Sequence, residues 1–224
     1  MKQTFLTAAL LTGLALTTAP SAHAQGIRFG LKAGANYSNL AGDLADEDLY
    51  DSKFGVHGGF MVNLALTDDG FLSVQPELLY SQKGYQYNGS QLFGTYKYSG
   101  KVRYDYLDVP VLLRIKADNL FFEAGPQYSY LINVNNSSQR TITVGGLTVE
   151  APDNYNQDLS NTNRNEFGYV AGLGYQSDAG ALLGLRYNGA FGDIAKNDTY
   201  WNGELRNARN SVFQLYLGYM FGGK

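Results

Sequence analysis

Eight stretches of alternating apolar and polar residues constrain the fold of this chain more than any other feature. In order along the chain they are 26–40, 53–66, 71–84, 101–116, 120–134, 166–176, 181–192 and 210–221. Successive side chains of a β-strand point to opposite faces of a sheet, so such alternation predicts strands with one apolar and one polar face. The sequence therefore predicts an all-β protein with eight strands.

The links between these stretches alternate strictly in length. The short links are 67–70, 117–119 and 177–180, and the long links are 41–52, 85–100, 135–165 and 193–209. Barrels of bacterial outer membranes have short periplasmic turns and long extracellular loops, and a tilted strand needs about 9–11 residues to cross. We therefore predict an eight-stranded antiparallel up-and-down transmembrane β-barrel with that arrangement of turns and loops, in the outer membrane of a Gram-negative bacterium.

The N-terminal residues 1–24 have the features of a secretory signal peptide. Lys2 precedes an apolar run within 5–16, and Ala22-His23-Ala24 is a small-x-small cleavage pattern. Cleavage after Ala24 is expected to leave residues 25–224 as one barrel domain. Without Lys2 this domain has 16 basic and 20 acidic side chains and no basic patch suited to nucleic acid, so no nucleic acid partner is expected.

The composition of the polar strand faces predicts which face lines the barrel. A soluble lipocalin-like barrel also has eight strands, but its apolar face points inward. The polar faces here are rich in glycine with occasional charges, which suits a crowded interior and makes a poor water-facing surface. We therefore place the glycine-and-charge face inside and the Leu/Phe/Tyr face in lipid.

Aromatic residues near the strand ends predict two belts at the membrane boundaries. The belt on the loop side is expected to contain Tyr37, Tyr80, Tyr104, Tyr130, Tyr169, Tyr187 and Phe191. The belt on the turn side is expected to contain Phe71, Phe122, Tyr175 and Phe221.

Two local features conflict with regular strands. Prolines occur within the predicted strands at positions 76, 110 and 126, and bulges are expected there because proline removes a ladder donor. In the fourth strand, Val102, Tyr104 and Tyr106 have the opposite parity to the apolar face that follows them, and a bulge near 106–110 would bring both sets to one face. Within the third long link, two short arms around a Gly-Gly pair predict a hairpin over 141–150 that stands above the rim.

Five segments resemble the PorT-like outer-membrane β-barrel family of Bacteroidota, which is also described as the porin family or outer membrane protein β-barrel domain. They are GLKAGANYSNL (30–40), QPELLYSQKG (75–84), YLDVPVLL (106–113), EAGP (123–126) and LGYMF (217–221). The resemblance implies an eight-stranded outer-membrane barrel without a fixed activity. It implies outer-membrane lipid and the barrel-assembly machinery as partners, with Phe221 as the C-terminal aromatic residue that assists assembly. A narrow channel or an accessory component of a secretion system is one alternative function.

Charged side chains on the predicted inner faces form one candidate cluster. Its members are Arg28, Lys32, Glu77, Asp108, Arg114, Lys116, Glu123 and Arg186. An eight-stranded barrel is just wide enough inside for side chains to fill it, and unpaired charges there would lose several kcal/mol each to desolvation. We therefore expect structural ion pairs that plug the barrel, in preference to a pore or a proton path.

His57 is the single histidine that follows residue 24, and it lies in the middle of a strand on the glycine-rich face. Catalysis by a Ser/His/Asp triad would need a serine and an acid beside it. An interior histidine without a catalytic role is favoured, and a membrane-embedded lipid- or peptide-modifying enzyme that uses His57 is the alternative. One histidine and no cysteine make a zinc or haem site improbable, so no cofactor is expected. The acidic residues within 43–51 lack the spacing of a calcium loop.

The long links are rich in Asn, Ser and Asp and contain many aromatic residues. Aromatic and small polar side chains together form adaptable binding surfaces, so an extracellular ligand or surface protein is a candidate partner of the loops. The predicted function is accordingly that of a plugged barrel, which is an envelope-structural or surface-interaction protein without catalysis.

Overall fold

The computed structural model describes residues 26–42, 44, 49–91, 96–144, 147–156, 162–195 and 207–222. Its strands are β1 (Ile27–Ala41), β2 (Tyr50–Ala65), β3 (Leu72–Gln91), β4 (Tyr96–Ala117), β5 (Leu120–Val144), β6 (Leu147–Asn156), β7 (Asn165–Gln176), β8 (Ala181–Ala190) and β9 (Arg209–Phe221). None of the described residues forms a helix that is long and apolar enough to cross a membrane. The expected signal peptide, with its cleavage residues Ala22 and Ala24, lies outside the described residues.

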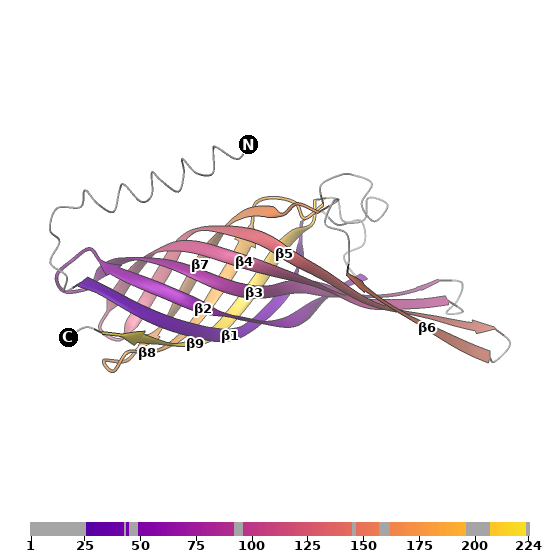
Figure 1. Ribbon diagram of the computed structural model, residues 1–224, viewed down its shortest axis with the longest axis horizontal. Helices are drawn as coiled ribbons and strands as arrows, with labels where there is room; N and C mark the ends of the chain where they lie inside the picture. The colour runs from indigo at the N-terminus through magenta and orange to yellow at the C-terminus, as the bar shows by residue number, and fades with distance from the viewer. Residues whose placement is uncertain are drawn as a thin grey trace.

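The strands close into a ring in which all neighbours are antiparallel. The hydrogen-bonded order is β4-β3-β2-β1-β9-β8-β7-β5, and β4 also pairs with β5. This closure confirms the predicted eight-stranded up-and-down barrel. The ninth strand, β6, pairs with β5 beyond the barrel. Figure 1 shows the tilted strands of the barrel and, at the right-hand end, the loop-side parts of β3, β4 and β5 continuing with β6 as a narrow ribbon. We call the direction toward this ribbon up and the direction toward the short turns down. We call this ribbon the projecting sheet.

The burial of alternate residues confirms the predicted orientation of the barrel strands. On β1, the side chains of Phe29 and Leu31 are exposed on the outside, whereas Lys32 and Asn36 are buried inside. Glycine on the inner face makes room for long neighbours. A Cβ atom added to Gly172 would lie 2.7 Å from Cγ of Arg186 on the adjacent strand, so this position has no space for a side chain.

The structure extends the barrel beyond the predicted strand ends. The expected loop 85–100 is largely the continuation of β3 and β4, which pair from Tyr85↔Val102 to Gln91↔Tyr96. The hairpin expected over 141–150 is confirmed, and its arms are longer because β5 and β6 pair from Asn135↔Asn156 to Val144↔Leu147. Many outward positions here are polar, so the strands lack the apolar alternation that marks the membrane-spanning parts.

The bulges lie elsewhere than predicted. Ladder partners on either side of the prolines at 76, 110 and 126 keep one register, so the expected bulges at these residues are wrong. Each proline instead sits beside a short gap in the ladder on one side, which accommodates its missing N–H. Register shifts occur in β2 between Ser52 and His57 and in β5 at Ile132, opposite Asp105 and Tyr106 of β4. Both shifts lie where the projecting sheet leaves the barrel, and bulges there add local twist.

No change of parity occurs in β4, contrary to the sequence-based expectation. Val102, Tyr104 and Tyr106 are all buried on the inner face, in line with Asp108 below them. The physical reason is a change of solvent along the strand. Below this level lipid surrounds the barrel and apolar residues face outward, whereas above it water surrounds the protein and apolar residues face inward.

The aromatic belts are present with one correction. Tyr37, Tyr80, Tyr169 and Phe191 are exposed on the loop side, and Phe71, Phe122, Tyr175 and Phe221 are exposed on the turn side. Tyr130 and Tyr187 are half-buried. Tyr104 was expected in the belt but is fully buried inside the barrel.

A charge on the outer face is expected to destabilise the barrel in proportion to its depth. Leu185→Lys places an ammonium group in the middle of the apolar band, between Leu173 and Leu215 on the neighbouring strands, and should cost about 2–4 kcal/mol of unfolding free energy. Phe191→Lys at the rim should cost about 0–1 kcal/mol. Urea unfolding in lipid vesicles measures both values, and equal costs would contradict the assigned membrane orientation.

Candidate functional site

Glu77 on β3 is the centre of a buried ion-pair cluster in the lower half of the barrel. Arg186 of β8 donates to both carboxylate oxygens of Glu77, at 2.7 and 2.8 Å, and Nζ of Lys32 on β1 lies 2.7 Å from Oε2. Arg186 also pairs through Nε with Glu123 of β5, which accepts a hydrogen bond of 2.9 Å from the Tyr216 hydroxyl. Side chains from five strands therefore meet across the bore.

Arg114 of β4 joins this cluster through an amide. Its NH1 donates to Oε1 of Gln75 at 2.9 Å, and Nε2 of Gln75 donates to Oε1 of Glu77 at 2.7 Å. The guanidinium group also lies over the ring of Phe121, 3.6 Å from its centroid. This stacking places a cation–π contact at the turn end of the bore.

A second buried cluster surrounds Lys83 of β3 in the upper half of the barrel. Nζ of Lys83 lies 3.2 Å from Asp108 of β4 and 3.1 Å from Glu166 of β7, and donates to Oγ of Ser129 at 3.2 Å. The Asn210 side chain donates to both Glu166 and the Tyr106 hydroxyl. The ammonium group of Lys83 lies 4.5 Å from the centroid of the Tyr106 ring.

The structure places six of the eight charged residues expected in the interior inside the bore. These are Lys32, Glu77, Asp108, Arg114, Glu123 and Arg186. Arg28 and Lys116 lie near the turn rim, are half-buried and enter none of the described ion pairs.

The sequence-based cluster lacked two members, Lys83 and Glu166. Both have the parity of the inner face, Lys83 in line with Glu77 on β3, so the alternation itself contained the signal. With them, the two clusters contain four cations and four carboxylates, so the charge within the clusters balances.

Apolar side chains close the bore above and below the charges. The upper group contains Leu40, Tyr85, Tyr87, Val102, Tyr104, Tyr106, Leu131, Val134, Ile194 and Ala208. The lower group contains Met61, Phe121, Leu182, Tyr216 and Met220. Successive ring contacts at centroid distances of 6.2–6.5 Å connect Tyr106, Tyr104, Tyr85, Tyr87 and Tyr98 in a line from the bore onto the projecting sheet. Protein side chains thus fill the barrel at three levels.

His57 lies inside the bore, with 3% of its surface exposed. Its Nδ1 is 2.6 Å from Oδ1 of Asn36, and the Asn36 amide donates to Oγ of Ser81. None of the described hydrogen bonds joins His57 to a serine or a carboxylate, so the described contacts do not form a triad. Within the described ranges, no group of three or more His, Cys, Asp or Glu residues is placed to hold a metal ion. The acidic residues at 43 and 46–48 lie outside those ranges.

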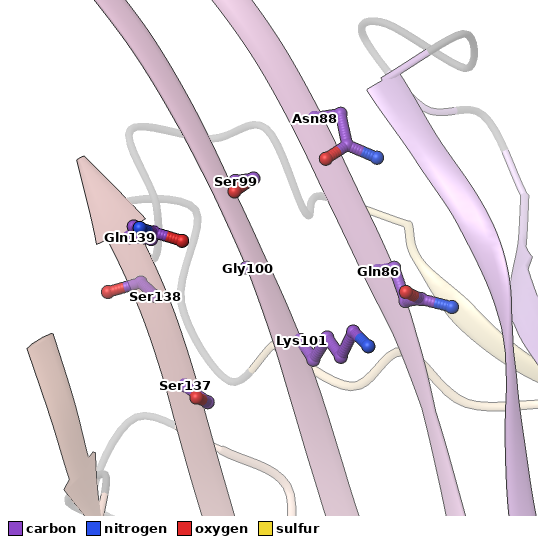
Figure 2. A pocket seen from close by; sticks show the side chains of 8 residues that line it. All are labelled: Gln86, Asn88, Ser99, Gly100, Lys101, Ser137, Ser138 and Gln139. Carbon is purple, nitrogen blue, oxygen red and sulfur yellow. The ribbon is translucent and has the colours of Figure 1, made fainter. Parts of the chain in front are cut away.

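The outward face of the projecting sheet carries two adjoining polar hollows. The first, of about 400 Å³, is lined by Gln86, Asn88, Ser99, Gly100, Lys101, Ser137, Ser138 and Gln139, and Figure 2 shows these side chains on three neighbouring strands. The second, of about 410 Å³, shares Asn88 and Ser99 with the first and extends to Lys97, Tyr98 and Thr141. Amides, hydroxyls and ammonium groups predominate in both linings, so these hollows suit a hydrophilic ligand.

The chain matches one protein family and is similar to several solved structures. The model of a protein family described as outer membrane protein beta-barrel domain matches residues 20–196. Similar solved structures include Neisserial surface protein A, with 13% identity, coverage of 86% of this chain and 97% of that chain, and a TM-score of 0.45. OprG from Pseudomonas aeruginosa has 13% identity, coverage of 92% of this chain and 100% of that chain, and a TM-score of 0.43. Ail of Yersinia pestis has 12% identity, coverage of 88% of this chain and 99% of that chain, and a TM-score of 0.42. No curated protein sequence matches the chain.

Removal of the central carboxylate is expected to destabilise the barrel strongly. Glu77→Gln leaves Lys32 and Arg186 as buried cations without their shared partner, which should cost about 3–5 kcal/mol in urea unfolding. Adding Lys32→Met to Glu77→Gln should recover part of that loss, because it restores the charge balance. The control Lys116→Gln at the turn rim should change stability by less than about 0.5 kcal/mol. A similar small effect for Glu77→Gln would show that the charge cluster contributes little.

Proposed function

This chain belongs to the outer membrane protein β-barrel domain family, and from that premise we propose that it is a plugged, non-catalytic barrel that holds a surface-interaction sheet outside the cell. Its location is the outer membrane of a Gram-negative bacterium. The finer parts of the proposal are membership of the PorT-like branch in Bacteroidota, signal cleavage after Ala24, and assembly by the barrel-assembly machinery through Phe221.

One observation carries the assignment as a plug, namely the ion pairs that cross the bore. Lys32, Arg186, Glu77 and Glu123 come from four different strands and meet at its centre, between the two apolar groups. An ion that passed through would have to break these contacts and enter two apolar regions, each at a large desolvation cost. The same packing argues against a narrow channel as the function.

The projecting sheet supports the assignment as an interaction surface. It extends β3, β4 and β5 beyond the membrane band, and its described side chains at Leu147 and Val149 are exposed by 77% and 64%. Of the described strands, only β5 pairs with β6, so the outer edge of β6 is open to a further strand. Open sheet edges add extended peptides through main-chain hydrogen bonds, and exposed apolar side chains add specificity. A soluble surface protein or an extended segment of one is therefore the kind of partner that we propose.

The plug is expected to prevent steady ion conduction. Purified protein in a planar lipid bilayer should show no stable open level, because charged and apolar side chains fill the bore. Truncation of the upper group by Tyr85→Ala together with Tyr104→Ala should still give a closed barrel, since the charge clusters below remain. Large, steady openings of the unmodified protein would refute the plug and favour a channel.

Excision of the tip of the projecting sheet is expected to separate interaction from folding. Replacing 139–152 with an Asn-Gly turn that joins Ser138 to Asp153 keeps the β5–β6 register and removes the exposed apolar tip. The barrel should unfold within about 0.5 kcal/mol of the parent, because the removed residues pair with one another and with residues 96–99 of β4, all within the projecting sheet and outside the closed barrel.

Adhesion of expressing cells measures the interaction itself. Cells that display the parent should aggregate or adhere to protein-coated surfaces more than cells that display the excised form at equal surface density. Equal adhesion by the two forms would mean that the projecting sheet is not the interaction surface.

A further inference from the structure

The outward face of β2, β3 and β4 changes chemistry in a fixed order above the membrane. The apolar band ends at the pair Tyr80↔Leu107, and both side chains are exposed. The pairs Gln82↔Asp105, Gly84↔Arg103 and Gln86↔Lys101 follow upward on the same face. Two residues along a strand span about 7 Å, so cationic side chains begin within one to two such steps of the lipid-facing band.

Three cations gather at this level. Nε of Arg103 lies 3.2 Å from Oδ1 of Asp105, and 40% of the Arg103 side chain is exposed. Lys101 is exposed two residues further along β4. Lys53 lies beyond the exposed belt residue Phe54 on β2. Burial lowers the pKa of the Lys53 ammonium, and the charges of Arg103 and Lys101 lower it further against the opposing effect of Asp105. The Ser38 hydroxyl contacts the carbonyl oxygens of both Lys53 and Gly84, and Gly84 pairs with Arg103, so the ladder also places Lys53 beside this group.

Carboxylates only partly neutralise this surface. Its outward positions carry the cations Lys53, Lys97, Lys101 and Arg103 against the carboxylates of Asp51 and Asp105, and Glu150 of β6 adjoins them, where it accepts a hydrogen bond of 3.0 Å from Gln139. Asp51 accepts a hydrogen bond from Asn88 at 3.4 Å and stands opposite Gln86 in the ladder. The patch thus has one positive charge in excess, in a chain whose formal net charge is −3.

Directly above the cations lies the first polar hollow, and Lys101 belongs to both features (Figure 2). Gln86 and Asn88 contribute amides, and Ser99 and Ser137 contribute hydroxyls. Each of these groups both donates and accepts hydrogen bonds, as the hydroxyls of a sugar do. A hollow with this lining and a cation at its membrane end suits a saccharide that is linked to an anionic group.

We propose that this surface binds a phosphorylated glycolipid of the outer leaflet. Its acyl chains lie along the apolar band below Tyr80 and Leu107, its phosphates bind Lys53, Lys101 and Arg103, and its sugars occupy the hollow above them. The order of the three protein layers matches the order of acyl chain, phosphate and sugar in such a lipid. A free phosphate or sugar would use only one of the three layers. The proposal depends on the membrane location of the barrel and is independent of the surface-interaction function proposed for the projecting sheet.

Binding to defined lipids tests this inference. The purified barrel is reconstituted in phosphatidylcholine nanodiscs that contain a small fraction of either lipid A, which is a phosphorylated glycolipid, or its dephosphorylated form, and the retained glycolipid is counted by native mass spectrometry. The parent should retain the phosphorylated form on the order of tenfold more strongly, and added salt should reduce the difference. The double variant Lys101→Gln/Arg103→Gln should lose this preference by a similar factor.

Matched controls keep the test decisive. Arg28→Gln/Lys116→Gln removes two cations near the opposite rim and should retain lipid A as the parent does. Heat-modifiable gel mobility verifies that each variant is folded, and the single variant Lys101→Gln, at an exposed position, replaces the double variant if the latter does not fold. Equal retention of both lipids by the parent, or an unchanged preference in folded Lys101→Gln/Arg103→Gln, would overturn the proposal. Full competition by inorganic phosphate would reassign the site to free phosphate.

Discussion

The pairing of Glu77 with Lys32 and Arg186 is the interaction on which the rest of the barrel depends. Lipid surrounds the outer face, so the polar side chains of the spanning strands face the bore. There the charges come from strands that are distant in sequence, since Glu77 and Arg186 are 109 positions apart, and each pair connects two sides of the cylinder. Removal of one partner would leave a charge in a space that water enters poorly, which makes the arrangement cooperative.

The membrane boundary organises the protein along its long axis. Below the boundary the polar side is inside, and above it the polar side is outside, although β4 passes through without a change of parity. Where water surrounds the protein, the apolar side chains of Val102 and Tyr104 face the interior. Where lipid surrounds it, the apolar side chain of Leu113 faces outward, because in both places apolar groups avoid water. The two register shifts, in β2 and β5, occur at this level, where a closed cylinder gives way to an open sheet.

Period-two alternation was sufficient to predict the barrel, its strand order and the interior positions of Lys32, Glu77 and Arg186. It failed where the solvent changes, because hydropathy identifies a face only when the surroundings are known. The alternation therefore places Tyr104 at the lipid boundary, and it predicts a loop where β3 and β4 continue with polar outward residues. The prolines misled for a different reason. A gap in the ladder on one side accommodates a proline as well as a bulge does, and the sequence does not distinguish between them. The grouping of Lys53 with Arg103 depends on the stagger of β2 against β3 and β4, which no local pattern encodes.

The strand β5 has three neighbours along its 25 residues: β4 over most of its length, β7 within the barrel and β6 beyond it. It is therefore continuous from the periplasmic turn to the outermost tip, with no hinge between the anchored and the external parts. A force that pulls the tip along the strand direction would act on the β4–β5 hydrogen bonds in shear. These bonds would then bear the force together and would not open one after another. The external ribbon is thus mechanically an extension of the barrel wall, and a force applied at the cell surface would be borne by the embedded cylinder as a whole.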